Sequence, residues 1–454
     1  MRVVKGDHIV VIGAARSGLA AACLLKERGA NVFVTDSGEI SESAKKRLAE
    51  NEIRWEENGH SESSKTADYA VVSPGVPDES PLIQFYQQQG KSVYSEIEIA
   101  SWFTEQSIFA VTGSNGKTTT ASWMAYTWQK AERDMILAGN IGSAFSDHVS
   151  KLNPQTDVIL EVSSFQLDHI DTFKPSVSML LNITPDHLNR YQNDFSKYTA
   201  SKLRIKENQT EGDTFIYWDE DPVVATKIEI EKSNSPVRYL SFSDSKEVDE
   251  GVFVREGKIY FKLNQKEEFL MYVHEMGLPG RHNLKNGMAT ALAARVAEIK
   301  NETIRESLMT FEGVAHRLEH VRTLNGVQWY NDSKATNVNA VWYALQSFSG
   351  PLVLIMGGRD KGNDYSDLIP ELREKVHTLI AIGEGKAAIE KQLRDEVPNF
   401  VTVQSMGQAV DCAHKWAKRG EVVLLSPACA SFDMFESYEH RGDVFKYAVN
   451  KLVG

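Results

Sequence analysis

The stretch AVTGSNGKTTTASW, residues 110–123, gathers glycines, a lysine and threonines directly after an apolar run. A strand that ends in a glycine turn and continues into a helix points backbone N–H groups at an anion, most often a phosphate. The turn reads Gly113-Ser114-Asn115-Gly116-Lys117-Thr118. It is shorter than the G-x-x-x-x-G-K-[ST] loop, because Val111 stands where that loop would have its first glycine. The sequence therefore predicts a polyphosphate site, with a helix that begins at Lys117 or just after it.

Several residues are candidates for the chemistry around this turn. Lys117 would bridge the β- and γ-phosphates of ATP, and Thr118 would offer its hydroxyl to Mg²⁺. Glu161 ends the predicted strand DVILE, and His187 follows another apolar run. A side chain at the carboxyl end of a strand lies where α/β sheets bind their ligands. Lys202, in YTASKLRIKEN, has by itself the pattern of a surface lysine.

Composition and charge are those of an ordinary globular protein. The 454 residues are 42% hydrophobic and 25% charged, and the formal net charge is −12. No basic footprint is present, which argues against nucleic-acid binding. The apolar runs are shorter than the ~18 residues of a membrane span, and the cysteines lack metal or redox spacing. We therefore expect a cytoplasmic protein of two or three domains, without a signal peptide or membrane insertion.

The first hundred residues alternate short apolar runs with helical patterns, which indicates parallel βαβ units. Strands are predicted at residues 8–13, 31–36 and 68–75, a helix at 17–29, and the alternation continues over 92–103. A glycine turn after the first strand, with Asp36 ending the second, is the Rossmann arrangement. The turn GAARSG has Ala15 in place of the glycine that lets a pyrophosphate approach. The sequence therefore favours a mononucleotide or UDP-type ligand over NAD.

Two further α/β segments follow, with a meander of strands between them. The helix predicted at 282–299 has His282 and Asn283 where a cap would lie. The other predicted strands are 108–113, 157–167, 177–184, 252–263, 268–276, 351–358, 379–383 and 421–427. The predicted domains are residues 1–105, 106–312 and 313–454.

Polar clusters follow the predicted strands of the last domain. Arg317 lies in AHRLEH, and Asp332 and Lys334 crowd together in WYNDSKATN. An aspartate could bind ribose hydroxyls, and an arginine or lysine could bind phosphate or carboxylate. The stretches GGRDKGNDY and SPACASFDMFESYEHRG supply Lys361 and Ser431, which would suit a small anionic substrate.

Taken in order, the motifs of this chain resemble those of the Mur ligases of peptidoglycan synthesis. The matching segments are TGSNGKTTT, GNIG, EVSSFQL, NITPDHLNRY, SKLRIKEN, GRHNLKN, HRLEH, NDSKATN and LLSPACASFDMF, and they cover essentially the whole chain. The resemblance implies an α/β fold of three domains: Rossmann-like for UDP, P-loop ATPase-type in the centre, and Rossmann-like for the amino acid. It also implies a reaction in which ATP phosphorylates the carboxylate of UDP-N-acetylmuramoyl-L-alanine and D-glutamate then captures the acyl phosphate. ATP, two Mg²⁺ ions and a monomeric enzyme are expected.

The resemblance further implies roles for individual side chains. It places Lys117, Glu161, His187, Lys202 and Lys334 at the reacting groups and makes Lys202 a carbamylated lysine, which turns a cation into an anion. The implied metal ligands are Thr118, Glu161, His187 and carbamylated Lys202. The implied ATP contacts are Gly113, Ser114, Asn115, Gly116, Lys117, Thr118, Thr119, Asn283, Asn286, Arg317 and Asp332. The implied UDP-substrate contacts are Arg16, Ser17, Asp36, Ser73, Asn140 and His187. The implied D-glutamate contacts are Thr336, Lys361, Ser431, Phe432 and Tyr438. Arg16 stands where an apolar residue is expected.

Other functions remain open at this level. One alternative is another ATP-dependent amide ligase with the same short turn, such as the meso-diaminopimelate-adding Mur enzyme or folylpolyglutamate synthase. The first usually carries an Asp-Asn-Pro-Arg motif, which is absent here, and the second would lack a UDP-suited first domain. A nucleotide-dependent switch or binding module belongs to a different class and would need no second substrate pocket. An NAD-linked oxidoreductase is disfavoured by Ala15.

Overall fold

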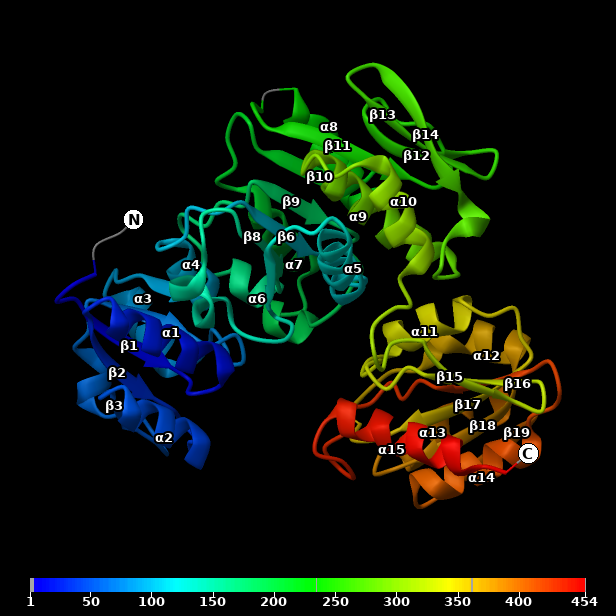
Figure 1. The fold of residues 1–454 in the computed structure, drawn as a ribbon. Coiled ribbons are helices and arrows are strands. Elements are labelled where there is room, and N and C mark those ends of the chain that lie inside the picture. The colour runs from blue at the N-terminus through cyan, green and yellow to red at the C-terminus, as the bar shows by residue number, and fades with distance from the viewer. Residues whose placement is uncertain (1–3, 234, 361, 454) are drawn as a thin grey trace. The chain divides into compact units, whose positions relative to one another are not determined.

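The computed structural model of the chain describes residues 4–233, 235–360 and 362–453. The chain forms two compact units, Met1–Gly277 with Leu284–Phe311, and Leu278–Asn283 with Glu312–Gly454. In the described residues the first unit holds two β-sheets and the second holds one, and helices accompany each sheet (Figure 1). The predicted α/β class with three sheet-containing parts is confirmed. The domain boundaries at 105 and 312 stay a prediction.

The first sheet is parallel, with the strand order β3-β2-β1-β4-β5. Its middle strand is apolar on both faces: Ile9 and Val11 belong to one core cluster, and Val10 and Ile12 belong to another with Tyr86. Parallel strands buried on both faces read as continuous apolar runs, as HIVVI does. The strands are His8–Ile12 (β1), Asn31–Thr35 (β2), Arg54–Glu56 (β3), Tyr69–Val72 (β4) and Val93–Ser95 (β5). The helices are Arg16–Glu27 (α1), Glu42–Glu50 (α2), Pro81–Gln88 (α3) and Glu96–Ser101 (α4).

The second sheet has the order β14-β13-β12-β11-β10-β9-β6-β8-β7 and is parallel except for the pairs β12–β13 and β13–β14. The strands are Ile108–Thr112 (β6), Met135–Gly139 (β7), Asp157–Glu161 (β8), Val177–Leu180 (β9), Thr214–Trp218 (β10), Arg238–Ser243 (β11), Gly251–Arg255 (β12), Lys258–Leu263 (β13) and Lys266–Tyr272 (β14). The α-helices are Lys117–Lys130 (α5), Ser164–Leu167 (α6), Phe195–Leu203 (α7), Pro222–Lys232 (α8), Arg281–Val296 (α9) and Asn301–Thr310 (α10). Helix α5 begins at Lys117, as predicted. The sheet order makes β9, β6 and β8 neighbours, so their carboxyl ends meet at one edge.

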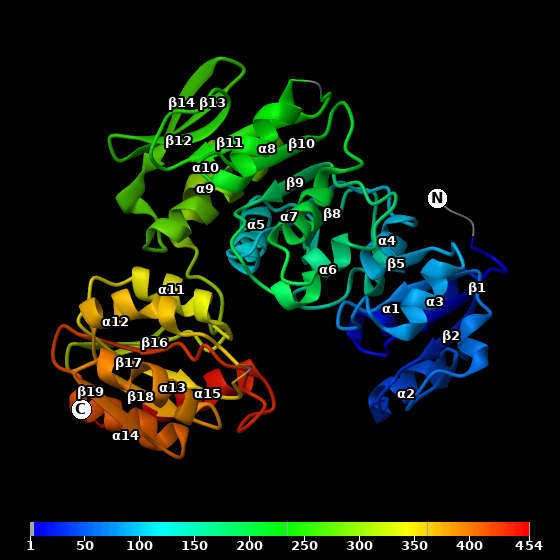
Figure 2. The same cartoon turned by 180° about the vertical axis from the view of Figure 1, so that it is seen from behind.

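The third sheet has the order β15-β16-β20-β17-β18-β19, and only β15–β16 is antiparallel. It lies between α11 and α12 on one face and α14 on the other (Figure 2). Alternate residues of strand β17 point to opposite faces of the sheet. Leu354 packs on the face covered by α11 and α12, and Ile355 packs on the face covered by α14. The strands are Glu319–Leu324 (β15), Val327–Asn331 (β16), Leu352–Gly357 (β17), Val376–Ile382 (β18), Asn399–Thr402 (β19) and Val422–Leu425 (β20). The helices are Val338–Gln346 (α11), Ile369–Lys375 (α12), Lys386–Leu393 (α13), Met406–Trp416 (α14) and Tyr438–Lys451 (α15).

Three local predictions were wrong. The strand expected over 252–263 is two antiparallel strands, β12 and β13. The strand expected over 157–167 ends at Glu161 and is followed by α6, because Ser163 and Gln166 form a capping box that starts a helix. The helix expected from 282 begins at Arg281, so His282 and Asn283 lie in its first turn and not at its cap.

A buried carboxylate joins the first sheet's last helix to the second sheet's connections. Glu98, in α4, accepts hydrogen bonds from the backbone N–H groups of Asp171, Thr172 and Phe173 at 3.0, 2.9 and 2.7 Å, and from Trp102 Nε1 at 2.7 Å. Bonds to an ionised acceptor are among the stronger hydrogen bonds in proteins. Glu98 therefore fixes the two sheets of the first unit to each other.

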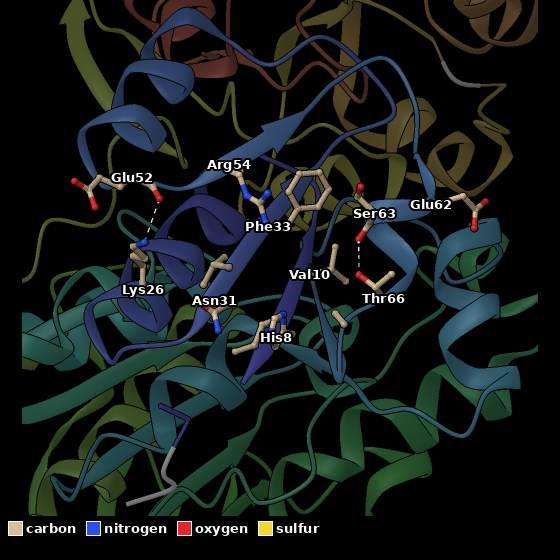
Figure 3. Close-up of a pocket in the computed structure, with 13 residues that line it drawn as sticks. His8, Val10, Lys26, Asn31, Phe33, Glu52, Arg54, Glu62, Ser63 and Thr66 are labelled. Carbon is tan, nitrogen blue, oxygen red and sulfur yellow. Dashed lines mark hydrogen bonds between the residues drawn. The ribbon is translucent and has the colours of Figure 1, made fainter. Parts of the chain in front are cut away.

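A hollow of about 460 Å³ lies at the amino ends of the first sheet, where β1, β2 and β3 begin at His8, Asn31 and Arg54. Figure 3 shows its rim, on which Lys26 Nζ donates to the carbonyl oxygen of Glu52 at 3.2 Å. Ligands of parallel sheets bind outside the opposite, carboxyl ends of the strands. The hollow is therefore separate from the edge at which the candidate site lies. No helix in the described part of the chain combines the length and the apolar character that a membrane crossing requires.

A second buried glutamate near the same junction is under-bonded. Glu96 is fully buried; its Oε1 accepts from the backbone N–H of Ser146 at 2.6 Å, and its Oε2 has no hydrogen-bond partner in the described structure. Burial raises the pKa of the Glu96 carboxyl to about 7, and the backbone bond from Ser146 opposes that shift. The folded protein therefore holds this proton more tightly than the unfolded chain does.

This difference predicts a pH-dependent stability. Because the folded pKa lies above the unfolded value of 4.5, stability falls as the pH rises from about 4.5 to about 7 and is flat above that window. At about 1.4 kcal/mol per pKa unit, the loss over this window is at most about 3–4 kcal/mol. Glu96→Gln keeps the shape and removes the charge, so we expect its denaturation midpoint to exceed that of the parent protein at pH 8 and to approach it at pH 5. Glu105→Gln, in an exposed loop, serves as the control. An equal difference between Glu96→Gln and parent at both pH values would contradict the assignment.

Candidate active site

The glycine turn between β6 and α5 is held on the segment that follows β9. Ser114 N donates to the carbonyl oxygen of Asn182 at 2.9 Å, and Asn115 N donates to the side-chain Oδ1 of Asn182, also at 2.9 Å. Ser114 Oγ donates to the carbonyl oxygen of Thr184 at 2.8 Å and accepts from Thr184 N at 2.9 Å. Tyr198 OH, from α7, lies 3.0 Å from Ser114 Oγ. The turn is therefore preorganised by side chains outside the motif.

Both glycines of the turn have positive φ values, 151° at Gly113 and 88° at Gly116. Gly116 precedes α5 in a left-handed conformation, which an L-residue adopts only at a cost. A Cβ atom there would lie 2.4 Å from Oδ1 of Asn286, so α9 passes directly over the turn. Thr118 and Thr119, in the first turn of α5, are buried. The predicted strand, turn and helix are therefore all present.

Two lysines converge on one backbone carbonyl. Lys117 Nζ donates to the carbonyl oxygens of Gly113 at 2.7 Å and Ser114 at 2.8 Å, and Lys202 Nζ donates to the same Gly113 oxygen at 2.8 Å. Lys202 is 2% exposed, so the reading of this residue as a surface lysine was wrong. Burial, followed by the charge of Lys117, lowers the Lys202 pKa well below its ordinary value, against the opposing charges of Asp186, Asp168 and Glu161. A lowered pKa favours the neutral amine, which is the nucleophilic form of a lysine.

Glu161 ends β8 beside these lysines and is 3% exposed. Its Oε1 accepts from Asn140 Nδ2 at 2.9 Å, and its Oε2 has no hydrogen-bond partner within the described residues. An orphaned buried carboxylate oxygen next to a phosphate-type turn fits a cation ligand. The chemistry of the donor set is therefore compatible with Mg²⁺, which is commonly held by one or two carboxylates together with phosphate oxygens. In the described chain no three His, Cys, Asp or Glu side chains group closely enough to hold a metal by themselves.

His187 is exposed, unlike the buried Glu161 and Lys202. It has a left-handed backbone, with φ 52°, at the start of the 3₁₀ helix Leu188–Tyr191, and its side chain is 56% exposed. Its Nε2 lies 3.6 Å from Asp186 Oδ2, and its ring meets Phe165 edge-on. Asp186 was not singled out from sequence, although it precedes His187 in the same motif.

At the first sheet, the predicted UDP residues lie around the turn after β1. Asp36 does not point freely into solvent, because its Oδ2 accepts from Ala14 N at 2.8 Å and its Oδ1 from Gly38 N at 2.9 Å. Ser73 Oγ donates to the carbonyl oxygen of Gly13 at 2.9 Å, and Ser17 is buried in the first turn of α1. These side chains shape the turn and leave the start of α1 as the candidate anion site.

In the second unit, Asp332 is buried at the end of β16. Its Oδ2 accepts from Ser426 Oγ at 2.7 Å and its Oδ1 from Leu318 N at 3.2 Å. Burial raises the Asp332 pKa to about 6, and the charge of Arg317 opposes the rise. Asn283, also in this unit, donates from Nδ2 to the carbonyl oxygen of Pro279 at 2.8 Å.

The predicted amino-acid residues gather at the carboxyl ends of β16 and β20. Lys334 Nζ lies 5.6 Å from the ring centre of Tyr438, which begins α15. Ser431 is buried, Thr336 is exposed, and Phe432 is 63% exposed. The predicted Lys361 lies outside the described residues.

Sequence reasoning missed a buried arginine that organises this edge. Arg441, in α15, donates from Nε to Ser333 Oγ at 2.9 Å, from Nη2 to the Ser333 carbonyl at 2.8 Å, and from Nη1 to the Cys429 carbonyl at 3.0 Å. Burial lowers its pKa to about 10. Its only sequence signal was its place in the quoted stretch ending in EHRG, and nothing local distinguishes it from a surface arginine.

Family models match three successive parts of the chain. They are described as "MurD N-terminal domain" for residues 8–82, "Mur ligase middle domain" for residues 111–294, and "Mur ligase, glutamate ligase domain" for residues 316–429. The first covers the UDP-type turn, the second the glycine turn with both lysines, and the third the edge at Asp332.

Full-length relatives agree with these models. The chain is 47% identical to a UDP-N-acetylmuramoylalanine–D-glutamate ligase of Salinibacter ruber, covering 99% of each chain. It is 44% identical to the ligase of that name from Christiangramia forsetii, covering 98% of this chain and 100% of the relative.

Solved structures share the fold at low sequence identity. A MurF structure from Acinetobacter baumannii aligns with a TM-score of 0.61 at 16% identity, covering 98% of this chain and 93% of that one. The MurC structure from Thermotoga maritima aligns with a TM-score of 0.58 at 17% identity, covering 98% and 100%. With these matches to family models and to near-full-length relatives, the chain belongs to the Mur ligase family and, within it, to the UDP-N-acetylmuramoylalanine–D-glutamate ligases.

Proposed function

We propose that this chain joins D-glutamate to UDP-N-acetylmuramoyl-L-alanine through an amide bond, at the expense of ATP, in peptidoglycan precursor synthesis. The observation that carries the proposal is the convergence of Lys117 and Lys202 on the Gly113 carbonyl, beside the orphaned oxygen of Glu161. The relatives that match nearly the whole chain bear the name of this activity, which favours it over the other amide ligases.

The chemistry requires two anions to meet. A carboxylate oxygen of the UDP-substrate attacks the γ-phosphorus of ATP; the new P–O bond forms as the bond to the ADP oxygen breaks. The amine of D-glutamate then attacks the acyl carbon, loses a proton, and expels phosphate. Both steps depend on positioning and on positive charge near the phosphates. Lys117 Nζ donates to two carbonyls of the turn, those of Gly113 and Ser114, and we assign Lys117 to the β- and γ-phosphates.

Bound Mg²⁺ would supply further positive charge against the repulsion between carboxylate and triphosphate. The residues that would hold it are Thr118, Glu161, His187 and Lys202, the last as its carbamate. Carbamylation joins the neutral Lys202 amine to the carbon of CO₂ with loss of a proton. The lowered Lys202 pKa and its complete burial support this modification.

The remaining contacts are proposals carried over from the family resemblance. The backbone N–H groups at the start of α1, at Arg16 and Ser17, would face the UDP diphosphate, with Asp36, Ser73, Asn140 and His187 completing the substrate contacts. The proposed nucleotide contacts are Gly113, Ser114, Asn115, Gly116, Thr118, Thr119, Asn283, Asn286, Arg317 and Asp332. The proposed D-glutamate contacts are Thr336, Lys361, Ser431, Phe432 and Tyr438, with Lys334 near the reacting groups. The domains 1–105, 106–312 and 313–454, the two Mg²⁺ ions, a monomeric state and a cytoplasmic location are also proposed.

The first test measures ADP release with UDP-N-acetylmuramoyl-L-alanine, ATP and Mg²⁺, with and without D-glutamate. We expect release to depend on D-glutamate, and Lys117→Ala to lower it by about 10²–10³-fold, because one preorganised charge is removed from the transition state. Lys130→Ala is the matched control, since Lys130 ends the same helix and pairs with Glu306 at 2.7 Å. Release that ignores D-glutamate, or an undiminished rate in Lys117→Ala, would refute the proposal.

The second test concerns the shape of the turn. Gly116→Ala places a Cβ against Asn286 and forces an alanine into a left-handed conformation, which costs about 1–2 kcal/mol. We expect the affinity for a non-hydrolysable ATP analogue, measured by calorimetry, to fall at least tenfold. Gly90→Ala is the control: Gly90 also has a positive φ, 66°, but a Cβ there meets nothing within 4 Å. Unchanged affinity in Gly116→Ala would show that the turn does not hold the nucleotide.

A further inference from the structure

Arg16 is the first residue of α1, and its side chain leaves its own sheet. Nη1 donates to the carbonyl oxygen of Gly142, and Nη2 reaches the carbonyl oxygens of Gly139 at 3.5 Å and Asn140 at 3.4 Å. Gly139 is the last residue of β7 in the second sheet, and Asn140 and Gly142 lie in the loop that follows it; residues 139–142 are called the 139–142 loop below. A planar guanidinium suits such a cluster because its donors diverge in a fixed fork.

Helix stability does not account for an arginine at this position. The amino end of a helix carries partial positive charge, so a cation in the first turn is unfavourable by about 0.3–1 kcal/mol. No acidic residue occupies the first turn of α1 to offset it. The structural role of Arg16 is therefore to hold the 139–142 loop through these hydrogen bonds.

The 139–142 loop, to which Arg16 donates, is itself hydrogen-bonded to Glu161. Asn140 Nδ2 donates to Glu161 Oε1 at 2.9 Å, and Asn140 N donates to the Glu161 carbonyl oxygen at 2.8 Å. A Cβ on Gly139 would lie 2.4 Å from that same carbonyl, so the backbones are in close contact. A displacement of this loop would move or release the Glu161 carboxylate. The hydrogen bonds thus run from the UDP-type turn to Glu161 Oε1, the carboxylate oxygen next to the orphaned Oε2.

We propose that Arg16 is a positioning residue for the divalent-cation site. It fixes the 139–142 loop so that Asn140 holds one oxygen of Glu161 and leaves Oε2 available to Mg²⁺. Affinity for the cation thereby depends on an arginine that lies in the turn assigned to the UDP-substrate. The inference rests on the proposed function for the identity of the cation, but its hydrogen-bond chain is independent of that function.

The experiment replaces Arg16 and measures cation binding directly. Mn²⁺ binding is followed by electron paramagnetic resonance in the presence of a non-hydrolysable ATP analogue, and Mg²⁺ is titrated in the ADP-release assay. We expect Arg16→Leu to raise the Mn²⁺ dissociation constant and the half-saturating Mg²⁺ concentration by about 3–10-fold, which corresponds to the loss of one or two hydrogen bonds. KM for D-glutamate stays unchanged. Arg16→Lys keeps the charge but loses the forked donors of the guanidinium. We expect it to raise the Mn²⁺ dissociation constant and the half-saturating Mg²⁺ concentration by a smaller factor.

Arg28→Leu is the matched control. Arg28 follows the same helix and donates to Ser150 Oγ at 3.3 Å in the second sheet's connections, outside the 139–142 loop. We expect its Mn²⁺ affinity to equal that of the parent protein. In an Asn140→Ala background, Arg16→Leu should add no further loss, since the side-chain bond that holds Glu161 Oε1 is already absent.

Two results would overturn the proposal. One is unchanged Mn²⁺ affinity in both Arg16 variants. The other is a higher KM for the UDP-substrate with unchanged Mn²⁺ affinity, which would make the Arg16 side chain a substrate contact. Failure of the proposed function is distinguishable, because it would appear in the parent protein as ADP release that ignores D-glutamate, whereas the Mn²⁺ measurement requires no turnover.

Discussion

Two amines, the buried one of Lys202 and the half-buried one of Lys117, share a single carbonyl oxygen, that of Gly113, and the site is arranged around that constraint. Like charges so close together are costly in a low-dielectric interior. The carboxylates of Glu161, Asp168 and Asp186 offset part of this cost, and burial drives Lys202 toward its neutral form. A polyanion bound at the turn would offset more of this electrostatic cost. The arrangement is thus electrostatically incomplete in a way that favours a phosphate ligand and a lysine that can lose its proton.

Sheet order brings these groups together. Gly113 follows β6, Glu161 ends β8 and Asn182 follows β9; the three strands are neighbours in the sheet although they are separated in sequence. Because all three strands are parallel, their carboxyl ends share one edge, and the turn can rest on the backbone of Asn182. Lys202 and Tyr198 lie one helical turn apart on α7, and both contact the glycine turn.

The junction between the two sheets of the first unit is polar. Glu98 receives three backbone N–H groups, Arg190 donates to the carbonyls of Pro74 and Val76, and Arg16 spans to the loop after β7. Directional bonds define one relative placement more sharply than apolar packing does, because each loses strength with small errors of angle. A substrate that binds at both the UDP-type turn and the phosphate site would need the two sheets to be held in one relative placement.

Patterns within a few residues predicted much of this protein. Apolar runs predicted the strands, and the glycine turn predicted a helix that begins at Lys117. The end of a predicted strand pointed to Glu161. Each of these depends only on local geometry. The motif resemblance supplied the expected ligand residues, which stay a prediction. Local patterns failed where contacts are long-range: Lys202 had the pattern of a surface residue, and Arg441 and the Arg16 contacts left no signal.

The sequence by itself determined the class of fold, the phosphate-type turn and the family. Tertiary structure alone decided that Lys202 is buried against Lys117, that one Glu161 oxygen is held while the other is open, and that Arg16 reaches the second sheet. Burial and electrostatic coupling are sums over neighbours supplied by other strands and helices, so no window of sequence contains them.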